Sequence, residues 1–388
     1  MNRFAAASGV SLVAAALAGL WLAVTRSPVA TTDLRLWLGY GAAGFLAAGV
    51  GLEIMRPGAF AAPQRLNQIY LWSAVAGIAL LSLPPVGTIA GLHRLGWLGF
   101  VIGAASYAYL IWWRPPMPGK QPEAFGDVLA PVRQRRGDVA HDVVARAMVA
   151  AAPAYLFLVA VAGVADGHML GSRSELLLLF GWLGSLTLGG ALYVWPRLLA
   201  HPPGSRHLAR WGAAAWHLGL VLSVIMRQPW LLAVTGVGTL MLLADLMPTL
   251  RGVRRGRPYV VGSRRRYPKV GARIGFALAA LLLLLLGAVL FFPTGLLAWQ
   301  RMLSIGVAVA ANLTLLHHLR PAFGAQILRP RGGWMPSLLA IASLGLGSFP
   351  RLSAVAVAIA CLYLAASWLP GLSLRPPKEE ERRTRRPV

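Results

Sequence analysis

The stretch 175–200 reads ELLLLFGWLGSLTLGGALYVWPRLLA, and it has the length and composition of a membrane-spanning helix. Gly181, Ser185 and Gly189 recur every four residues, so small side chains form a stripe along one side of that helix. Small residues let a neighbouring backbone approach closely, which is how helices associate in lipid. Aromatic residues, a proline and an arginine close the stretch, as expected where a helix leaves the bilayer. The pattern predicts a helix inside a bundle, with little surface left for lipid.

The composition of the whole chain indicates a membrane protein. It has 388 residues, of which 57% are hydrophobic and 13% are charged, whereas a soluble protein carries about a quarter charged residues. Apolar runs of about 18 residues or more recur along the chain, and they do not alternate as barrel strands do. Cys361 is the only cysteine, so the chain alone forms neither an intrachain disulfide nor an iron–sulfur cluster.

We therefore predict an all-α, polytopic transmembrane bundle of about twelve helices. The third and eleventh are the least regular, because Pro84-Pro85 interrupts one and the other is only about fifteen residues long before Pro350. The predicted spans are 4–24, 34–54, 69–89, 93–113, 144–165, 175–197, 207–226, 229–248, 273–293, 297–318, 335–349 and 352–371.

The distribution of basic residues predicts the orientation. With twelve spans, 30 of the 37 lysines and arginines fall in the N-terminus, the even-numbered loops and the C-terminal tail. Cytoplasmic loops carry this excess, so both ends of the chain are predicted to lie in the cytoplasm. We expect the bacterial cytoplasmic (inner) membrane as the location.

Loop lengths predict a 4+4+4 arrangement. The two long basic loops, 114–143 and 249–272, follow the fourth and the eighth span, whereas a major-facilitator transporter divides as six and six. The single transmembrane domain 1–374 would then comprise the blocks 1–113, 144–248 and 273–374. The charge-mixed, proline-bearing tail 375–388 is predicted to be disordered.

The formal net charge of +25 raises the question of a nucleic-acid partner. The cations lie in short loops between apolar runs, which is where cytoplasmic basic residues of membrane proteins belong. We therefore expect the lipid bilayer as the partner, together with other membrane subunits, and no nucleic acid.

His217 is the one histidine placed deep in a predicted span. It lies ten residues into 207–226, which is about 15 Å and close to the midplane of the bilayer core. Polar groups at that depth usually face the bundle interior. His217 is therefore either a functional residue, as a ligand of a metal or heme or in a proton relay, or a neutral histidine bonded to a neighbouring helix.

His317 and His318 are the second candidates, at the cytoplasmic end of the tenth span. Adjacent residues on a helix point about 100° apart, so the pair alone is no bidentate site. The two are either ligands or histidines at the membrane interface, where cations favour the helix dipole.

Two charged residues inside or beside the spans complete the set of candidates. Asp245 lies within the end of the eighth span, either paired near the cytoplasmic face with Arg251 or Arg210, or in a proton or ion pathway. Arg301 opens the tenth span from the outer side, where it could meet an anionic group or extend to the interface.

Two segments carry a family resemblance. The sequence LLFGWLGSLTLGGALYVWPRL (178–198) and the sequence WQRMLSIGVAVAANLTLLHHLRPAFGAQILRPRGG (299–333) resemble the NnrS family of heme- and copper-containing membrane proteins, which are associated with responses to nitric oxide. The first pattern and the 4+4+4 division are also similar to subunit I of heme-copper oxidases. The resemblance implies heme contact through His217, with His317 or His318 and a heme propionate at Arg301.

The chain departs from that family in its histidines. The early HAHEM-type motif of NnrS proteins is missing, since His93 is the only histidine among the first 140 residues. We therefore do not expect copper to be retained. No phosphate loop, GxSxG or HExxH signature is present, so we do not expect an enzyme. The alternatives to an NnrS-like, heme-binding protein of nitric oxide or respiratory metabolism are a cofactor-free accessory subunit, a degenerate heme-copper-oxidase-like protein and a small-molecule transporter.

Overall fold

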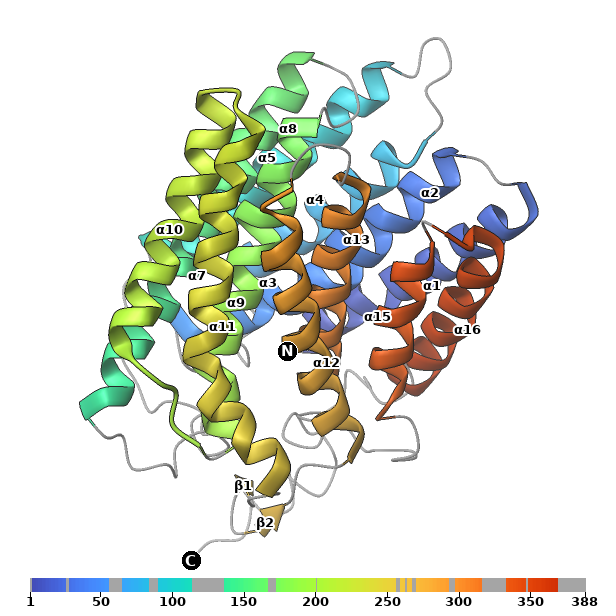
Figure 1. Cartoon of the computed structure of the whole chain (residues 1–388). Coiled ribbons are helices and arrows are strands. Elements are labelled where there is room, and N and C mark those ends of the chain that lie inside the picture. The colour runs from blue at the N-terminus through green and yellow to red at the C-terminus, as the bar shows by residue number, and fades with distance from the viewer. Residues whose placement is uncertain are drawn as a thin grey trace, which may run out of the picture.

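The fold is known from a computed structural model, shown as ribbons in Figure 1. It is an all-helical bundle with one short hairpin. The structure describes residues 2–25, 28–55, 65–83, 90–113, 136–166, 172–199, 201–255, 259–261, 264–266, 270–292, 297–315, 333–346 and 348–368.

Eight helices in these ranges are long and apolar enough to cross a membrane, which confirms a multi-pass helical bundle. The span Ser174–Leu198 is 83% buried inside the bundle, whereas the other seven are 39–56% buried. The predicted interior helix is therefore the most enclosed of these spans. The helices are α1 (Asn2–Thr25), α5 (Ala90–Trp112), α7 (Arg136–Asp166), the continuous α8 (Ser172–Leu176), η3 (Leu177–Gly184) and α9 (Ser185–Leu198), α10 (Arg206–Ile225), η4 (Pro229–Leu231) with α11 (Leu232–Arg255), α12 (Val270–Val289) and α16 (Pro350–Trp368).

Further helical segments occupy the rest of the predicted spans. The predicted third span, 69–89, begins earlier and ends ahead of Pro84-Pro85, because the residue before a proline is disfavoured in a helix. These segments are the continuous α2 (Pro28–Arg35), η1 (Leu36–Ala43) and α3 (Gly44–Met55), then α4 (Arg65–Leu81), α13 (Leu297–Ala308) with η5 (Val309–Leu313), and α15 (Met335–Gly345).

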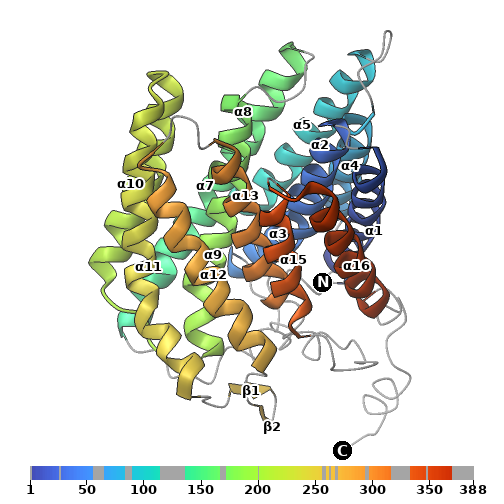
Figure 2. The same ribbon diagram turned by 45° about the vertical axis from the view of Figure 1, so that its right-hand side comes forward.

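The outer helices close into a ring. Along the described chain, α1, α4, α5, α7, α10, α11, α12, α15 and α16 each pack against the next, and α16 packs back against α1. Figures 1 and 2 show this ring from two sides, with the red α16 beside the dark-blue α1. The two ends of the helical domain therefore support one another.

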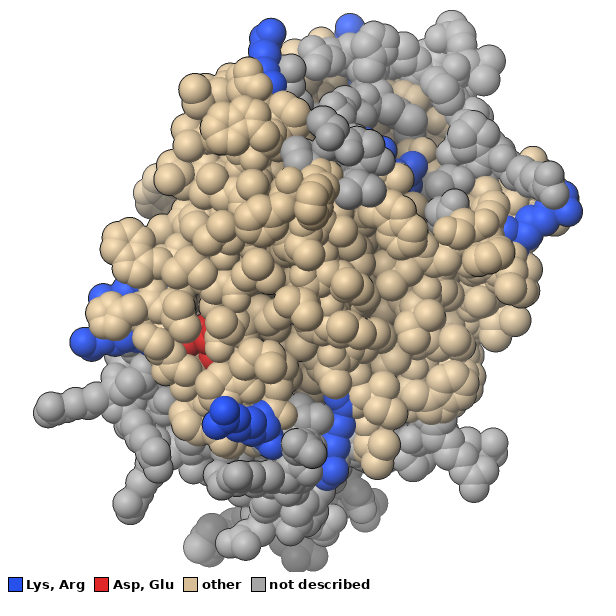
Figure 3. All heavy atoms as spheres, viewed as in Figure 1, with Lys and Arg blue, Asp and Glu red and all other residues tan. Residues whose placement is uncertain are grey.

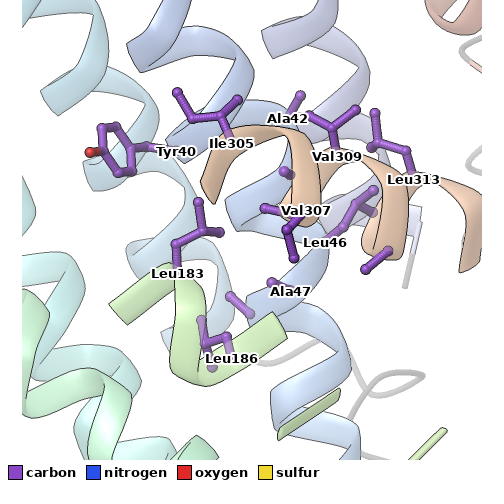
Figure 4. Close-up of a cluster of buried hydrophobic side chains, with 14 of the residues drawn as sticks. Tyr40, Ala42, Leu46, Ala47, Leu183, Leu186, Ile305, Val307, Val309 and Leu313 are labelled. Atoms are coloured by element: carbon purple, nitrogen blue, oxygen red, sulfur yellow. The ribbon is translucent and has the colours of Figure 1, made fainter. Parts of the chain in front are cut away.

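Three helices fill the centre of the ring: η1–α3, η3–α9 and α13–η5, which contact one another. Figure 4 shows their apolar side chains meeting, with Leu46 from the first helix, Leu186 from the second and Val309 from the third. All three side chains are at most 3% exposed. This contact region is the core on which the ring helices pack.

Each central helix contains a stretch of π-helix, at η1, η3 and η5. A π-helical turn shifts the register of the hydrogen bonds and often marks a functional site, since it costs stability and is uncommon. The described part of the chain places all three such stretches in the central helices.

Apolar side chains cover the outside of the ring. Trp72, Ile225 and Leu352 are more than two-thirds exposed, as expected where a helix faces lipid. In Figure 3 a tan belt crosses the middle of the molecule, and the blue lysines and arginines lie toward its ends. This distribution fits contact with a lipid bilayer.

The basic segment 249–272 differs from the predicted loop. The helix α11 continues to Arg255, and β1 (Tyr259–Val261) pairs antiparallel with β2 (Arg264–Arg266), with Val260 opposite Arg265. Most of the loop 114–143 and the whole tail 375–388 lie outside the described residues.

Candidate functional site

A cavity of about 210 Å³ lies at the end of the bundle where the central helices begin. All three central helices contribute charged or polar side chains to it, and the ring helices α4 and α5 contribute apolar ones. We call this cavity the arginine pocket. Its lining residues are Thr32, Arg35, Leu36, Tyr40, Leu81, Trp97, Glu175 and Arg301.

An ion-paired triad joins the three central helices at the arginine pocket. Glu175 Oε2 lies 2.7 Å from Arg301 Nη2, and Glu175 Oε1 lies 3.6 Å from Arg35 Nη1. The first distance is that of a charge-assisted hydrogen bond, and the second is an ion pair beyond hydrogen-bond length. The side chains are 14–21% exposed. Arg301 was predicted to meet an anionic group or the interface, and the anionic group that it meets is Glu175.

The described lining of the arginine pocket carries an excess of positive charge. Two arginines face one glutamate, and the buried Nε of Arg301 has no hydrogen-bond partner among the described residues. An unsatisfied buried donor on a charged group is costly. The pocket is therefore electrostatically suited to a further anionic or hydrogen-bond-accepting group.

Asp33 follows Thr32, which lines the arginine pocket, and is not itself in the described lining. It precedes the predicted span 34–54, is 4% exposed, and its Oδ1 has no hydrogen-bond partner among the described residues. Burial raises the pKa of Asp33 to about 6, because desolvation disfavours the charged form.

The three central helices share a sequence register that becomes visible once they are seen together. Asp33, Glu175 and Gln300 each stand six residues ahead of a buried glycine and open the apolar part of their helix. Gln300 is 0% exposed, and neither side-chain atom of its amide has a partner within the described chain. The register gives each central helix one acidic or amide group at its opening. The glycines are Gly39, Gly181 and Gly306.

A second polar contact lies deeper between the central helices. Asn312 Nδ2 donates a hydrogen bond of 3.0 Å to Thr187 Oγ1, and both residues are 3% exposed. Thr187 follows Glu175 by twelve residues, which places it roughly 18 Å further along the helix, near mid-depth of a bilayer. A cavity of about 10 Å³, lined by Thr187 and Ser304 among apolar residues, lies beside it and has about the volume that one water needs.

His217 lies on α10 and contacts the ring helix α7. Its Nδ1 is 2.8 Å from the hydroxyl oxygen of Tyr155, and its Nε2 is buried with no hydrogen-bond partner among the described residues. His217 therefore bonds to a neighbouring helix through Nδ1, and its role as a ligand stays a prediction. Its unpartnered Nε2 is the atom that a ligand would use.

The small-residue stripe near His217 is filled by protein side chains. A Cβ added at Gly181 would meet the Tyr155 ring at 2.5 Å, and one at Gly184, next to the stripe, would meet the Trp216 indole at 2.7 Å. The Tyr155 and Trp216 rings therefore occupy the space in front of these two glycines. At Gly189 the added Cβ would meet a backbone carbonyl of α7 at 2.9 Å, the close backbone approach that the stripe predicts.

His317 and His318 lie outside the described residues, so their role as ligands stays a prediction. Within the part of the chain that the structure describes, no group of three or more His, Cys, Asp or Glu residues could hold a metal ion.

Asp245 pairs with a residue that the sequence had placed in a loop. Its Oδ1 lies 3.2 Å from His141 Nε2, not beside Arg251 or Arg210. His141 belongs to α7, which begins at Arg136 and so buries this histidine to 5% exposure. Asp245 is 0% exposed, and its Oδ2 has no partner among the described residues. Next to His141, Asp142 accepts a 2.7 Å hydrogen bond from Arg197.

The arginine pocket could not be found from the sequence, because its charged residues come from three distant helices. The register of Asp33, Glu175 and Gln300 is a signal that could have pointed to it. Comparison with known proteins adds no further evidence, since no protein-family model matches the chain and no curated protein matches it.

Proposed function

We propose that this chain is a transporter for a small polar solute in the bacterial cytoplasmic membrane. It spans the membrane twelve times in a 4+4+4 arrangement, with both termini in the cytoplasm. The arginine pocket then opens toward the outer side, and the solute passes between the three central helices.

One observation carries this proposal: the central helices, which contain π-helical stretches, share polar contacts at two levels, one at the arginine pocket and one at mid-depth. The Glu175–Arg301 pair lies at one end, and the Thr187–Asn312 hydrogen bond lies roughly 18 Å deeper. Transporters place their sites in interrupted helices near the bilayer midplane, where exposed backbone and polar side chains can coordinate a solute. An accessory subunit needs no polar groups at this depth.

The closed ring supports the twelve-span arrangement. Four of the helical segments are not among the eight long apolar helices, yet α4 and α15 are ring members and η1–α3 and α13–η5 are central. Because these shorter segments pack among the spanning helices, we propose that they cross the membrane together with them.

The orientation is tested by labelling single cysteines with a membrane-impermeant maleimide after Cys361→Ala. Ser205 and Gln228 are exposed at opposite ends of α10. We expect Gln228→Cys to be labelled from outside intact cells and Ser205→Cys only after permeabilisation. The reverse pattern would contradict the orientation.

Transport is tested through water access to Thr187. We expect Thr187→Cys to react with a small, water-soluble thiosulfonate, because a transported solute must pass this position. Wild type provides the baseline, since its only cysteine, Cys361, is buried. A Thr187→Cys protein as inert as wild type would favour the accessory subunit.

Heme contact, as in the NnrS family that the chain resembles, is the second candidate. The unpartnered Nε2 of His217 favours it, while the filled stripe beside it does not. Protein purified from heme-supplied cells should then show an absorption band that weakens in His217→Ala. A colourless wild type would remove this candidate and leave the transporter untouched.

A further inference from the structure

We propose that the arginine pocket binds a small monocarboxylate, with Arg301 as the principal ligand residue and Arg35 as the second cation. The inference names the solute class of the proposed transporter and rests on that function. It can be tested by binding alone, so its failure is distinguishable from failure of transport.

The arginine pocket already pairs its two arginines with a carboxylate, that of Glu175. Glu175 presents its two oxygens to two different arginines, one at 2.7 Å and one at 3.6 Å. A guanidinium is a planar fork that matches the two oxygens of a carboxylate. Glu175 therefore acts as an internal stand-in for the proposed ligand.

Arg301 keeps a hydrogen-bond donor that its contact with Glu175 does not use. The bond to Glu175 uses Nη2 of Arg301, while the buried Nε of the same side chain has no partner among the described residues. Nε and one Nη form a guanidinium edge that donates two parallel hydrogen bonds. A ligand carboxylate on that edge would satisfy Nε and share or displace Glu175.

The charge and size of the arginine pocket suit a small anion. Two arginines and one glutamate stand in its described lining, and a lining rich in arginine favours an anionic ligand over a neutral solute. The volume of about 210 Å³ is below that of most drug-binding pockets, and the apolar Leu36, Leu81 and Trp97 suit a short carbon chain.

Binding is measured as the rise in thermal unfolding temperature of the full-length protein in detergent, at constant ionic strength. We expect saturable stabilisation by acetate and pyruvate but none by acetamide, the uncharged counterpart of acetate. Inorganic phosphate should stabilise less than acetate. Equal stabilisation by acetamide, or stronger stabilisation by phosphate, would overturn the proposal.

Three variants assign the site. Arg301→Gln should abolish the response to acetate, and Arg301→Lys, which keeps the charge but loses the fork, should weaken acetate affinity about tenfold. Glu175→Gln should strengthen it about tenfold, because the internal competitor is removed. Arg210→Gln is the matched control, since Arg210 is exposed near the opposite end of the bundle.

The outcomes separate the inference from the proposed function. If Arg301→Gln fails to fold, the acetate affinities of Arg301→Lys and Glu175→Gln still show whether the pocket binds the ligand. An affinity that neither variant changes would mean that the arginines only clamp the helices, and it would overturn the inference. If acetate binds but Thr187→Cys does not react with the thiosulfonate, the carboxylate site is supported and the proposed transport function is contradicted.

Discussion

Asn312 donates a buried hydrogen bond of 3.0 Å to Thr187, a residue 125 positions away in the sequence. The bond ties the π-helical stretch of one central helix to the neighbouring central helix. The same Nδ2 also bonds to the carbonyl of Ala308, 2.9 Å away, so the amide satisfies a local backbone group and a remote side chain together. This hydrogen bond therefore holds two central helices together at the depth where the solute is proposed to pass between them.

A double-mutant cycle measures this contact. Asn312→Ala should lower the free energy of unfolding by about 1–3 kcal/mol, because it leaves Thr187 without its partner. Combined with Thr187→Val, the coupling energy should be roughly 0.6 kcal/mol, as for other hydrogen bonds between membrane helices. Strictly additive losses would show that the two side chains do not interact.

Gly184→Ala tests the packing of the central helix η3–α9 against Trp216 of α10. The new Cβ would lie 2.7 Å from the Trp216 ring, so we expect a loss of about 1–3 kcal/mol in unfolding free energy. Gly190→Ala on the same helix is the control, since its nearest neighbour is 3.6 Å away. That variant should keep or gain stability, because alanine favours helix. Equal losses of unfolding free energy in Gly184→Ala and Gly190→Ala would contradict the close contact between Gly184 and Trp216.

His141→Ala should be among the most destabilising histidine substitutions. It leaves Asp245 buried with no partner, which costs about 3–5 kcal/mol for a broken buried pair. His207→Ala, at an exposed position, should change stability by less than about 0.5 kcal/mol. Adding Asp245→Asn to His141→Ala should recover part of the loss. If His141→Ala and His207→Ala change the free energy of unfolding by the same amount, the His141–Asp245 pair is not buried as described.

Asp33 predicts a pH dependence of stability. Its pKa is raised from 3.8 to about 6 in the folded protein, so folding favours the protonated carboxyl group. The stability that this group contributes below pH 4 is therefore lost as the pH rises through 6. Asp33→Asn should therefore be more stable than wild type by about 1–2 kcal/mol at pH 7, and the difference should shrink toward pH 4. A difference that is the same at both pH values would exclude this residue as the cause.

The sequence predicts the parts of the fold that depend on apolar length and on small-residue spacing. The span 175–197 is an example, because its run of leucines and its glycine stripe are both local features. The helix is, as predicted, the most buried of the eight long apolar helices.

The parts that were missed depend on contacts between distant segments. His141 was assigned to a loop because the apolar run begins only at Val143, whereas α7 begins at Arg136. Arg301 looks like an interface residue when its helix is considered alone, and its pairing with Glu175 needs the three-dimensional fold. The π-helical stretches have no sequence signature that we can identify.

The most direct test of the account is the sidedness of Thr187→Cys modification, measured in vesicles of each orientation in the Cys361→Ala background. Leu186→Cys, a buried neighbour, serves as the control. A solute route between the central helices predicts that an impermeant thiosulfonate modifies Thr187→Cys from both sides, and that Leu186→Cys stays unmodified. Thr187→Cys that is inert from both sides would contradict the account.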